Sequence, residues 1–364
     1  MKKLYLSQIE NGSPISQDLY NPHGAILVPK GKTMTPKLRQ QLLRNNIDSF
    51  LIDITGYESI ENYYEHFEEP EIQQIEAVKK VYNNSFASLS SEFENFKRNR
   101  NLDKKTLRDT AKELVASIGK YQHVYLGLEG IRRKDFYTYI HSVDVAIFMI
   151  VMGKSLRMDE KNLEQAALAG LLHDIGKISI DDSILLKPGK LTNLEMEKMR
   201  KHTEIGYEIL KEKMNYPDEI ARAALEHHER MDALGYPGKI SWDKIHLYSR
   251  MAAICDVYDA ITGERVYKKA MLPHEAVEYL MTIVGKHLDR SLTTQFIRNI
   301  AVYPMGTKVE LNNGENGIVI KLHDGYPTRP VIKIPEKGIY RDLLQDNTIL
   351  IQNILCPEES SEAI

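Results

Sequence analysis

The histidines of this chain are concentrated in one stretch, because six of the twelve fall between His141 and His246. They lie among apolar residues spaced as on one face of a helix. Thr192-Asn193-Leu194-Glu195 predicts a capping box, and the helix that starts there would carry Met196 and His202 on one apolar face. A buried imidazole needs a partner on each ring nitrogen. Buried histidines on successive helices therefore predict a mainly α fold arranged around a polar centre.

Two aspartates share this environment. Asp174 follows His173 at the end of an apolar helical stretch that Gly176 is expected to stop, and Asp256 lies within an apolar helical run. Another helix is expected to end at His227. An unpaired buried carboxylate is costly, and a bound cation would remove the cost. The candidate metal ligands are His141, His173, Asp174, His202, His227, His228 and Asp256. Two metals on such a set would activate water and stabilise both oxygens of an in-line displacement at phosphorus, which predicts a hydrolase of phosphate esters.

A series of short motifs contains most of these residues. The motifs are His173–Lys177, Ile184–Thr192, His202, His227–Arg230, Gly235-Tyr236-Pro237 and Asp256–Ala260. Their order resembles the HD-GYP family, and the similarity runs from about Gly127 to Ile300. The resemblance implies an HD-type helical-bundle phosphodiesterase that opens cyclic di-GMP to linear pGpG, and sometimes on to GMP, by a hydroxide bound at a binuclear metal site.

The resemblance also implies how the ligands divide. The first metal would be surrounded by His141, His173, Asp174 and Asp256. The second would be surrounded by His202, His227 and His228, with Asp174 as the bridge. Nitrogen and oxygen ligands without thiolates favour two divalent transition metals, iron or manganese first and nickel or zinc as alternatives. Tyr137 replaces the glutamate of trinuclear members, which predicts two metals and not three.

Four residues are candidates for contact with substrate. By the family pattern Lys177 would lie near the scissile phosphate, where a lysine can offset charge or protonate the leaving oxygen. Arg265 and Lys268 match positions that resemble the family's phosphate contacts, and Tyr236 is expected to line the pocket. An ordinary surface role is the alternative for each of the four.

Two departures from the family pattern leave other functions open. Ala233 stands where the family usually has glycine, so the loop would be strained if this position needs a positive φ. Val266 replaces a usual proline. The altered loop supports a weakly catalytic cyclic di-GMP-binding signalling module, although the complete ligand set argues against it. A hydrolase of another cyclic dinucleotide or of a nucleotide phosphate is the other alternative.

The regions outside the histidine-rich stretch predict separate modules. We expect a small α+β module over residues 1–60, a helical connector over 61–126, the HD-GYP catalytic domain over 127–302 and a small β module over 303–364. Ala25–Val28 and Ser49–Ile52 are strand-like, and Asn312-Asn313-Gly314 predicts a hairpin turn in the last module. Helices within Gln73–Phe96 could pair in a homodimer, with packing inside the chain as the alternative.

Charge and hydropathy narrow the partners. The formal net charge of −3 gives no basic excess for a nucleic-acid polymer. The most apolar run, Val145–Met152, is far shorter than the roughly 18 residues of a membrane-spanning helix. Two cysteines without paired spacing suit a reducing compartment. We therefore expect a cytoplasmic protein without a membrane partner, whose ligand is cyclic di-GMP or a related cyclic dinucleotide.

Overall fold

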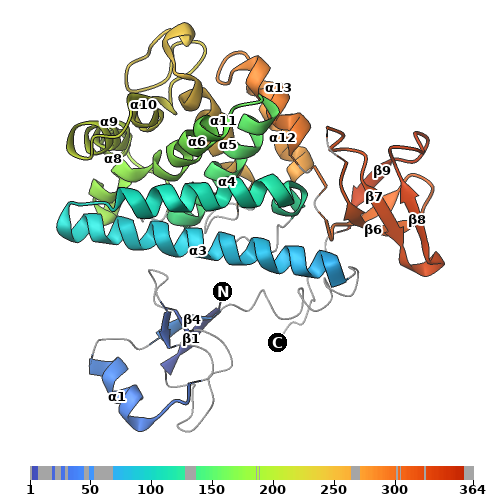
Figure 1. Ribbon diagram of the computed structural model, residues 1–364, viewed down its shortest axis with the longest axis horizontal. Coiled ribbons are helices and arrows are strands. Elements are labelled where there is room, and N and C mark those ends of the chain that lie inside the picture. Colours follow the sequence, from blue (N-terminus) through green and yellow to red (C-terminus); the bar gives the residue numbers. More distant parts are fainter. Residues whose placement is uncertain are drawn as a thin grey trace. The chain divides into compact units, whose positions relative to one another are not determined.

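The structure is a computed structural model that divides into two compact units (Figure 1). The first comprises Met1–His66 and Arg132–Tyr137, and the second comprises Phe67–Ile131 and Thr138–Ile364. The structure describes residues 2–6, 19–20, 26–28, 32–44, 49–52, 69–127, 137–185, 187, 189–263, 271–300, 302–303, 305–323 and 325–355.

The first unit contains a small antiparallel sheet and one helix. The strand order is β1 (Lys2–Tyr5), β4 (Ser49–Ile52), β2 (Leu19–Tyr20) and β3 (Ile26–Val28), and the helix is α1 (Pro36–Arg44). Lys2 lies opposite Ile52 in the register of the outer pair. The Oγ1 atom of Thr35 accepts a hydrogen bond from the Leu38 amide at 3.1 Å, which caps the start of α1. These elements form the α+β module that the sequence predicts.

Two long helices, α3 (Glu69–Asn99) and α4 (Lys104–Gly127), begin the second unit and lie side by side. The apolar face of α3 is buried within the chain, at Val78, Tyr82, Leu89, Phe93 and Phe96. Two hydrogen bonds join α3 to the helix that carries His141. The Tyr82 hydroxyl donates to Asp144 Oδ1 at 2.9 Å, and the Tyr139 hydroxyl donates to Glu94 Oε1 at 3.0 Å. Pairing of Gln73–Phe96 between two chains stays a prediction.

The rest of the second unit up to residue 300 is helical, and we call it the helical domain. Its α-helices are α5 (Tyr137–Ser155), α6 (Glu160–Leu172), α7 (Asp182–Leu185), α8 (Asn193–Arg200), α9 (His202–Tyr207), α10 (Asp218–Glu226), α11 (Leu247–Thr262), α12 (Pro273–Ile283) and α13 (Arg290–Asn299). Shorter elements are the 3-10 helices η3 (Ile175–Ser179) and η5 (Trp242–Lys244) and the π-helix η4 (Glu208–Lys213). The mainly α fold class is thus confirmed.

The centre of the helical domain is closely packed around α5. Every residue from Ile140 to Met152 is buried, which is typical of a helix that is covered on all sides. Phe148 on α5, Tyr258 on α11 and Phe296 on α13 meet edge to face, with ring centroids 5.2 to 5.7 Å apart. This packing holds α5 and α11, which carry His141 and Asp256, in a fixed mutual position.

The helix that leads to His202 begins as the sequence predicts and ends earlier. Thr192 and Glu195 form both halves of the capping box, and α8 starts at Asn193. None of the residues of α8 is buried. Met196, which we expected on an apolar face, is 40% exposed. The reason is that α8 stops at Arg200 on the surface and the chain becomes buried only at His202, where α9 begins.

The second unit ends in a five-stranded antiparallel sheet. The strand order is β8 (Ile339–Asp342), β7 (Val331–Ile334), β6 (Asn316–Lys321), β5 (Lys308–Leu311) and β9 (Ile351–Ile354). Gly314, at a φ of +80°, lies in the predicted turn between β5 and β6. The sequence predicts β5, β6 and β7, and the structure adds β8 and β9. None of the helices in the described parts of the chain is long and apolar enough to cross a lipid bilayer.

Candidate metal centre

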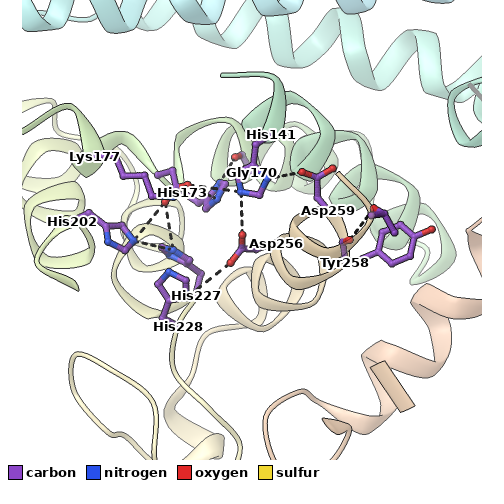
Figure 2. A network of polar contacts seen from close by, with 12 residues as sticks. His141, Gly170, His173, Lys177, His202, His227, His228, Asp256, Tyr258 and Asp259 are labelled. Atoms are coloured by element: carbon purple, nitrogen blue, oxygen red, sulfur yellow. Dashed lines mark hydrogen bonds and ion pairs between the residues drawn. The ribbon is translucent and has the colours of Figure 1, made fainter. Parts of the chain in front are cut away.

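The structure brings all seven sequence-predicted metal ligands together (Figure 2). His141 comes from α5, Asp256 from α11, and the other five from the chain segments at the ends of helices: His173 and Asp174 after α6, His202 at the start of α9, and His227 and His228 after α10. Figure 2 labels all of them except Asp174. Five of the seven are almost fully buried, whereas the side chains of His228 and Asp256 are 27% and 16% exposed. The centre therefore has a closed interior and an accessible edge at His228.

Asp174 lies between two sets of imidazoles. Its Oδ2 atom is 3.4 Å from His173 Nε2 and 3.8 Å from His141 Nε2. Its Oδ1 atom is 3.5 Å from His202 Nε2 and 3.8 Å from His227 Nε2. We call His141, His173 and Asp256 the first group, and His202, His227 and His228 the second group. Each oxygen of Asp174 faces one group, which is the geometry of a carboxylate that can bridge two cations.

Asp256 is a second carboxylate between the groups. Its Oδ1 atom lies 3.0 Å from His141 Nε2, and its Oδ2 atom lies 3.9 Å from His228 Nδ1. The ligand atoms of His141, His173 and Asp174 lie within 4.8 Å of one another, and those of the second group also lie within 4.8 Å. Both sets are thus compact enough for one metal ion each.

Four imidazoles are oriented through their Nδ1 atoms. The acceptors are the carbonyl oxygens of Gly170 for His173 (2.7 Å), Met199 for His202 (2.7 Å) and Ala223 for His227 (3.0 Å), and Oδ2 of Asp259 for His141 (2.7 Å). A carbonyl oxygen can only accept, so Nδ1 carries the proton in each of the three rings that it faces. The Nε2 lone pairs then point into the centre, as in metal-binding histidines.

Buried polar atoms that lack a hydrogen-bond partner indicate whether these residues fit a metal. Among the described residues, His173 Nε2 and Asp174 Oδ1 are buried and form no hydrogen bond. His202 Nε2 and His227 Nε2 are 3.4 Å apart, and with both protons on Nδ1 their lone pairs face each other. Such an arrangement is costly unless a cation lies between the donors. The residues therefore fit a divalent metal with nitrogen and oxygen ligands.

The electrostatics of the centre keep most ligands in their metal-binding forms. Burial lowers the pKa of His202, lowers that of His228 to about 4, and holds that of His227 well below its ordinary value. Burial would raise the pKa of Asp174, but the neighbouring positive charge of the Lys177 ammonium opposes burial, and that pKa stays well below its ordinary value. These three imidazoles are neutral and Asp174 is ionised at neutral pH.

His141 differs from the other imidazoles. Burial lowers its pKa, but hydrogen bonds to Asp256 and Asp259 outweigh burial and raise it to about 10. In the metal-free centre His141 is therefore protonated at neutral pH. Binding of a metal at its Nε2 atom would release that proton.

Lys177 lies beside the shared carboxylate. It belongs to η3, and its Nζ atom donates a short hydrogen bond to Asp174 Oδ2 (Figure 2). Its side chain is 25% exposed, so the ammonium lies where the centre meets solvent. A group in this position can reach both Asp174 and a ligand that enters from outside.

Gly176, in the same turn, allows a close approach of two backbones. A Cβ atom there would lie 1.8 Å from the His202 carbonyl oxygen and 2.7 Å from the Gly206 amide nitrogen. We expected Gly176 to end the preceding helix, but α6 already ends at Leu172. Its absent side chain instead lets η3 pack directly on α9, which places Asp174 beside His202.

The signature loop Gly235-Tyr236-Pro237 covers the second group. The Tyr236 ring stacks on His228, with centroids 4.7 Å apart and an interplanar angle of 29°. The buried Glu229 carboxylate accepts hydrogen bonds from the amides of Gly238 (2.5 Å), Lys239 (3.0 Å) and Ile240 (3.3 Å). This carboxylate holds the loop, and through it Tyr236, against His228.

The backbone of this loop restricts which side chains fit at positions 233 and 235. A Cβ atom at Gly235 would lie 2.5 Å from the His228 carbonyl oxygen, so only glycine fits. Ala233 adopts a φ of 56°, the left-handed region where glycine is favoured. The loop is formed with alanine at this position, at a strain of about 1 to 2 kcal/mol.

Two of the predicted substrate contacts lie outside the described residues, and two residues with a role at the centre were not predicted. Arg265, Val266 and Lys268 lie outside the described residues. Asp259, which orients His141, and Glu229, which holds the signature loop, were not predicted from the sequence to have these roles. Asp259 could have been found by the reasoning used for Asp256, because it lies one helical turn later on the same apolar helix.

Comparisons with known proteins agree with this geometry. A family model described as an HD domain matches residues 132–292, and one described as a KOW domain associated with HD domain matches residues 308–363. Cyclic di-GMP phosphodiesterase PA4108 of Pseudomonas aeruginosa is 34% identical over 262 residues, which are 72% of this chain and 63% of that protein. The cyclic di-GMP phosphodiesterase response regulator RpfG of Xanthomonas campestris is 40% identical over 42% of this chain and 40% of its own length.

Other relatives carry a different substrate in their names. The 3'3'-cGAMP-specific phosphodiesterase 2 of Vibrio cholerae is 34% identical over 51% of this chain and 34% of that protein. The chain thus spans less than two thirds of the length of these three relatives. Among solved structures, Bd1817, described as a HDG"Y"P protein from Bdellovibrio bacteriovorus, matches with a TM-score of 0.54 at 16% identity. It covers 81% of this chain and 98% of its own, which shows a shared fold.

Proposed function

Since this chain belongs to the HD-GYP family, we propose that it is a metal-dependent phosphodiesterase that hydrolyses cyclic di-GMP to pGpG, with GMP as the alternative end product. The observation that carries the proposal is the position of Asp174, whose two oxygens face two separate groups of imidazoles. The first group with Asp174 would hold one metal and the second group with Asp174 the other. The two expected metals are divalent iron or manganese ions, with nickel or zinc as alternatives.

The chain's own residues would position the substrate for this chemistry. When bound, the metals supply Lewis acidity at the phosphate and lower the pKa of water. Lys177 lies within hydrogen-bonding distance of Asp174 and is partly exposed. Its ammonium would offset the charge that develops on the scissile phosphate or donate a proton to the leaving oxygen. Tyr236 would line the entrance above His228. Arg265 and Lys268 stay proposed phosphate contacts.

A second substrate is supported by the relatives. Two Vibrio cholerae proteins named 3'3'-cGAMP-specific phosphodiesterases are 34% and 36% identical to parts of this chain. We therefore keep 3'3'-cGAMP as the second candidate substrate. A weakly catalytic cyclic di-GMP-binding signalling module is less well supported, because the signature loop is formed despite Ala233 and the seven candidate ligands lie together. A cytoplasmic location stays a prediction.

The test is a time course with purified protein loaded with manganese or ferrous iron. Cyclic di-GMP and 3'3'-cGAMP would be supplied separately, and products would be separated by chromatography. Asp174→Asn keeps the shape of the side chain but removes the shared charge, whereas Asp243→Asn changes an exposed carboxylate outside the centre. We expect pGpG from the wild type and from Asp243→Asn, and no product and less bound metal for Asp174→Asn. Full turnover by Asp174→Asn would refute the proposed site.

A further inference from the structure

We propose that Arg200 binds the second phosphate of the substrate, the one that is not being cleaved. This inference rests on the proposed function, since a cyclic dinucleotide carries two phosphates and the metal centre would take one. Arg200 is the last residue of α8 and lies two positions before His202. It is exposed, so its guanidinium is within reach of a ligand from solvent.

Arg200 lies at the outer end of a column of rings that leads to the second group. Its guanidinium carbon is 5.0 Å from the centroid of the Tyr236 ring. Tyr236 in turn stacks on His228 at 4.7 Å and meets the His202 ring edge-on at 6.5 Å. A guanidinium at this distance from a ring face is held by cation–π attraction. Arg200 therefore has a defined position beside the candidate metal centre although it is exposed.

The charge of Arg200 is available for a ligand. Three other arginines of the helical domain are paired with carboxylates: Arg222 with Glu226, Arg230 with Asp232 and Arg250 with Asp289. Within the described parts of the chain, no carboxylate forms an ion pair with Arg200. Lys177, by contrast, is paired with Asp174. Among these five cations, Arg200 has the charge that the described parts of the protein neutralise least.

The geometry favours a phosphate as the ligand. The guanidinium lies over the Tyr236 ring, and its N–H groups form no hydrogen bond or ion pair within the described parts of the chain. Free guanidinium N–H groups match two phosphate oxygens in a bidentate contact, which a lysine cannot form. The contact with Tyr236 also reduces the conformational entropy that Arg200 would lose on binding. The expected result is a contact that strengthens substrate binding more than the chemical step.

The experiment compares a substrate with two phosphates and one with a single phosphate. Wild type, Arg200→Ala, Arg200→Lys and Lys198→Ala would be assayed with cyclic di-GMP and with bis(p-nitrophenyl) phosphate. Lys198 is the matched control, because it is an exposed cation on the same helix without a ring beneath it. Equilibrium binding of a phosphorothioate analogue of cyclic di-GMP, which resists hydrolysis, and the thermal unfolding temperature would be measured on the same variants.

We expect Arg200→Ala to raise KM for cyclic di-GMP by about tenfold or more, the usual effect of losing a charge-assisted hydrogen bond. The kcat for cyclic di-GMP, both constants for the single-phosphate diester and the unfolding temperature should stay unchanged. Arg200→Lys should restore part of the affinity, and Lys198→Ala should behave as the wild type. The analogue should also bind more weakly to Arg200→Ala, with a smaller dependence on salt.

Other outcomes separate this proposal from the proposed function. If Arg200→Ala slows both substrates equally and lowers the unfolding temperature, Arg200 only supports the loop and the proposal is wrong. If the wild type hydrolyses neither substrate but binds the analogue through Arg200, the proposed function fails and the phosphate contact stands. If the wild type does not bind the analogue at all, both fail.

Discussion

The two groups of ligands around Asp174 differ in chemistry and in access. The first group adds Asp256 to two imidazoles, so it carries a carboxylate of its own besides the shared one. The second group consists of three imidazoles. Carboxylates suit manganese, and imidazoles suit zinc, nickel and iron. We therefore expect the first group to bind the harder metal and the second to tolerate a softer one.

The groups also differ in what orients them. The first group has one imidazole, His141, that is held by a side chain, that of Asp259, whereas His173 of the same group is held by a backbone carbonyl. In the second group His202 and His227 are both held by backbone carbonyls. The second group reaches the surface at His228, where the signature loop and Arg200 lie above it. The first group is thus the more enclosed one, and the second is the one that a substrate would meet first.

The largest expected effect comes from removing one imidazole from each group. His173→Ala and His227→Ala should each lower bound metal and slow turnover of cyclic di-GMP by at least about 100-fold. The reason is that a metal contributes several kcal/mol to the transition state and about 1.4 kcal/mol corresponds to a factor of ten. Metal content by mass spectrometry and initial rates would be measured beside His287→Ala, which lies outside the centre. Unchanged metal and rate in either variant would remove that group from the proposal.

A smaller effect should separate the groups. Asp259→Ala removes the acceptor for His141 Nδ1 and should lower the metal affinity of the first group by about 10- to 100-fold. The second group should keep its affinity, because its acceptors are backbone carbonyls. Competition with a chromophoric chelator would measure this, since only one of two titration steps should weaken. Equal weakening of both steps would mean that the groups act as one unit.

Glu229→Gln should affect the second group alone. The glutamine keeps the size of the side chain but loses the charge that accepts three amide hydrogen bonds. We expect a loss of about 1.5 to 3 kcal/mol in the free energy of unfolding, measured by chemical denaturation. KM for the substrate should rise because Tyr236 is held less firmly, while metal bound at the first group stays constant. A normal KM together with lost stability would place the loop outside the substrate path.

The smallest expected change is a gain. Ala233→Gly removes a left-handed strain of about 1 to 2 kcal/mol. Glycine, however, lowers the free energy of unfolding by about 0.4 to 1 kcal/mol, because it gives the unfolded chain more conformational freedom. The free energy of unfolding should therefore rise by up to about 1.6 kcal/mol, without a change in metal content. A loss of stability would show that Ala233 makes packing contacts that outweigh its backbone conformation.

Local sequence patterns predicted the elements better than the contacts between them. The capping box at Thr192 and Glu195, the helix end before His227 and the turn at Gly314 depend on neighbouring residues, and each is found in the structure. The burial of Met196 was predicted wrongly, because a helical period cannot show that α8 ends at Arg200.

In the candidate site, too, the sequence predicted the residues better than the contacts between distant segments. The burial cost of histidines and aspartates was enough to single out the side chains that come together. The hydrogen bond from His141 to Asp259 spans 118 positions of the chain, so no local pattern reveals it. Arg200 was also missed, because an exposed arginine at a helix end resembles any other surface cation until its ring partner is known.

Gly176 determines how closely Asp174 approaches the second group of ligands. With its Cβ position 1.8 Å from the His202 carbonyl oxygen, the backbone of η3 rests directly on that of α9. A single methyl group at this position would act as a spacer and would push the Asp174 carboxylate away from the second group without changing the identity of any candidate ligand. The spacing of the proposed two-metal centre would thus be set by an atom that the chain does not have.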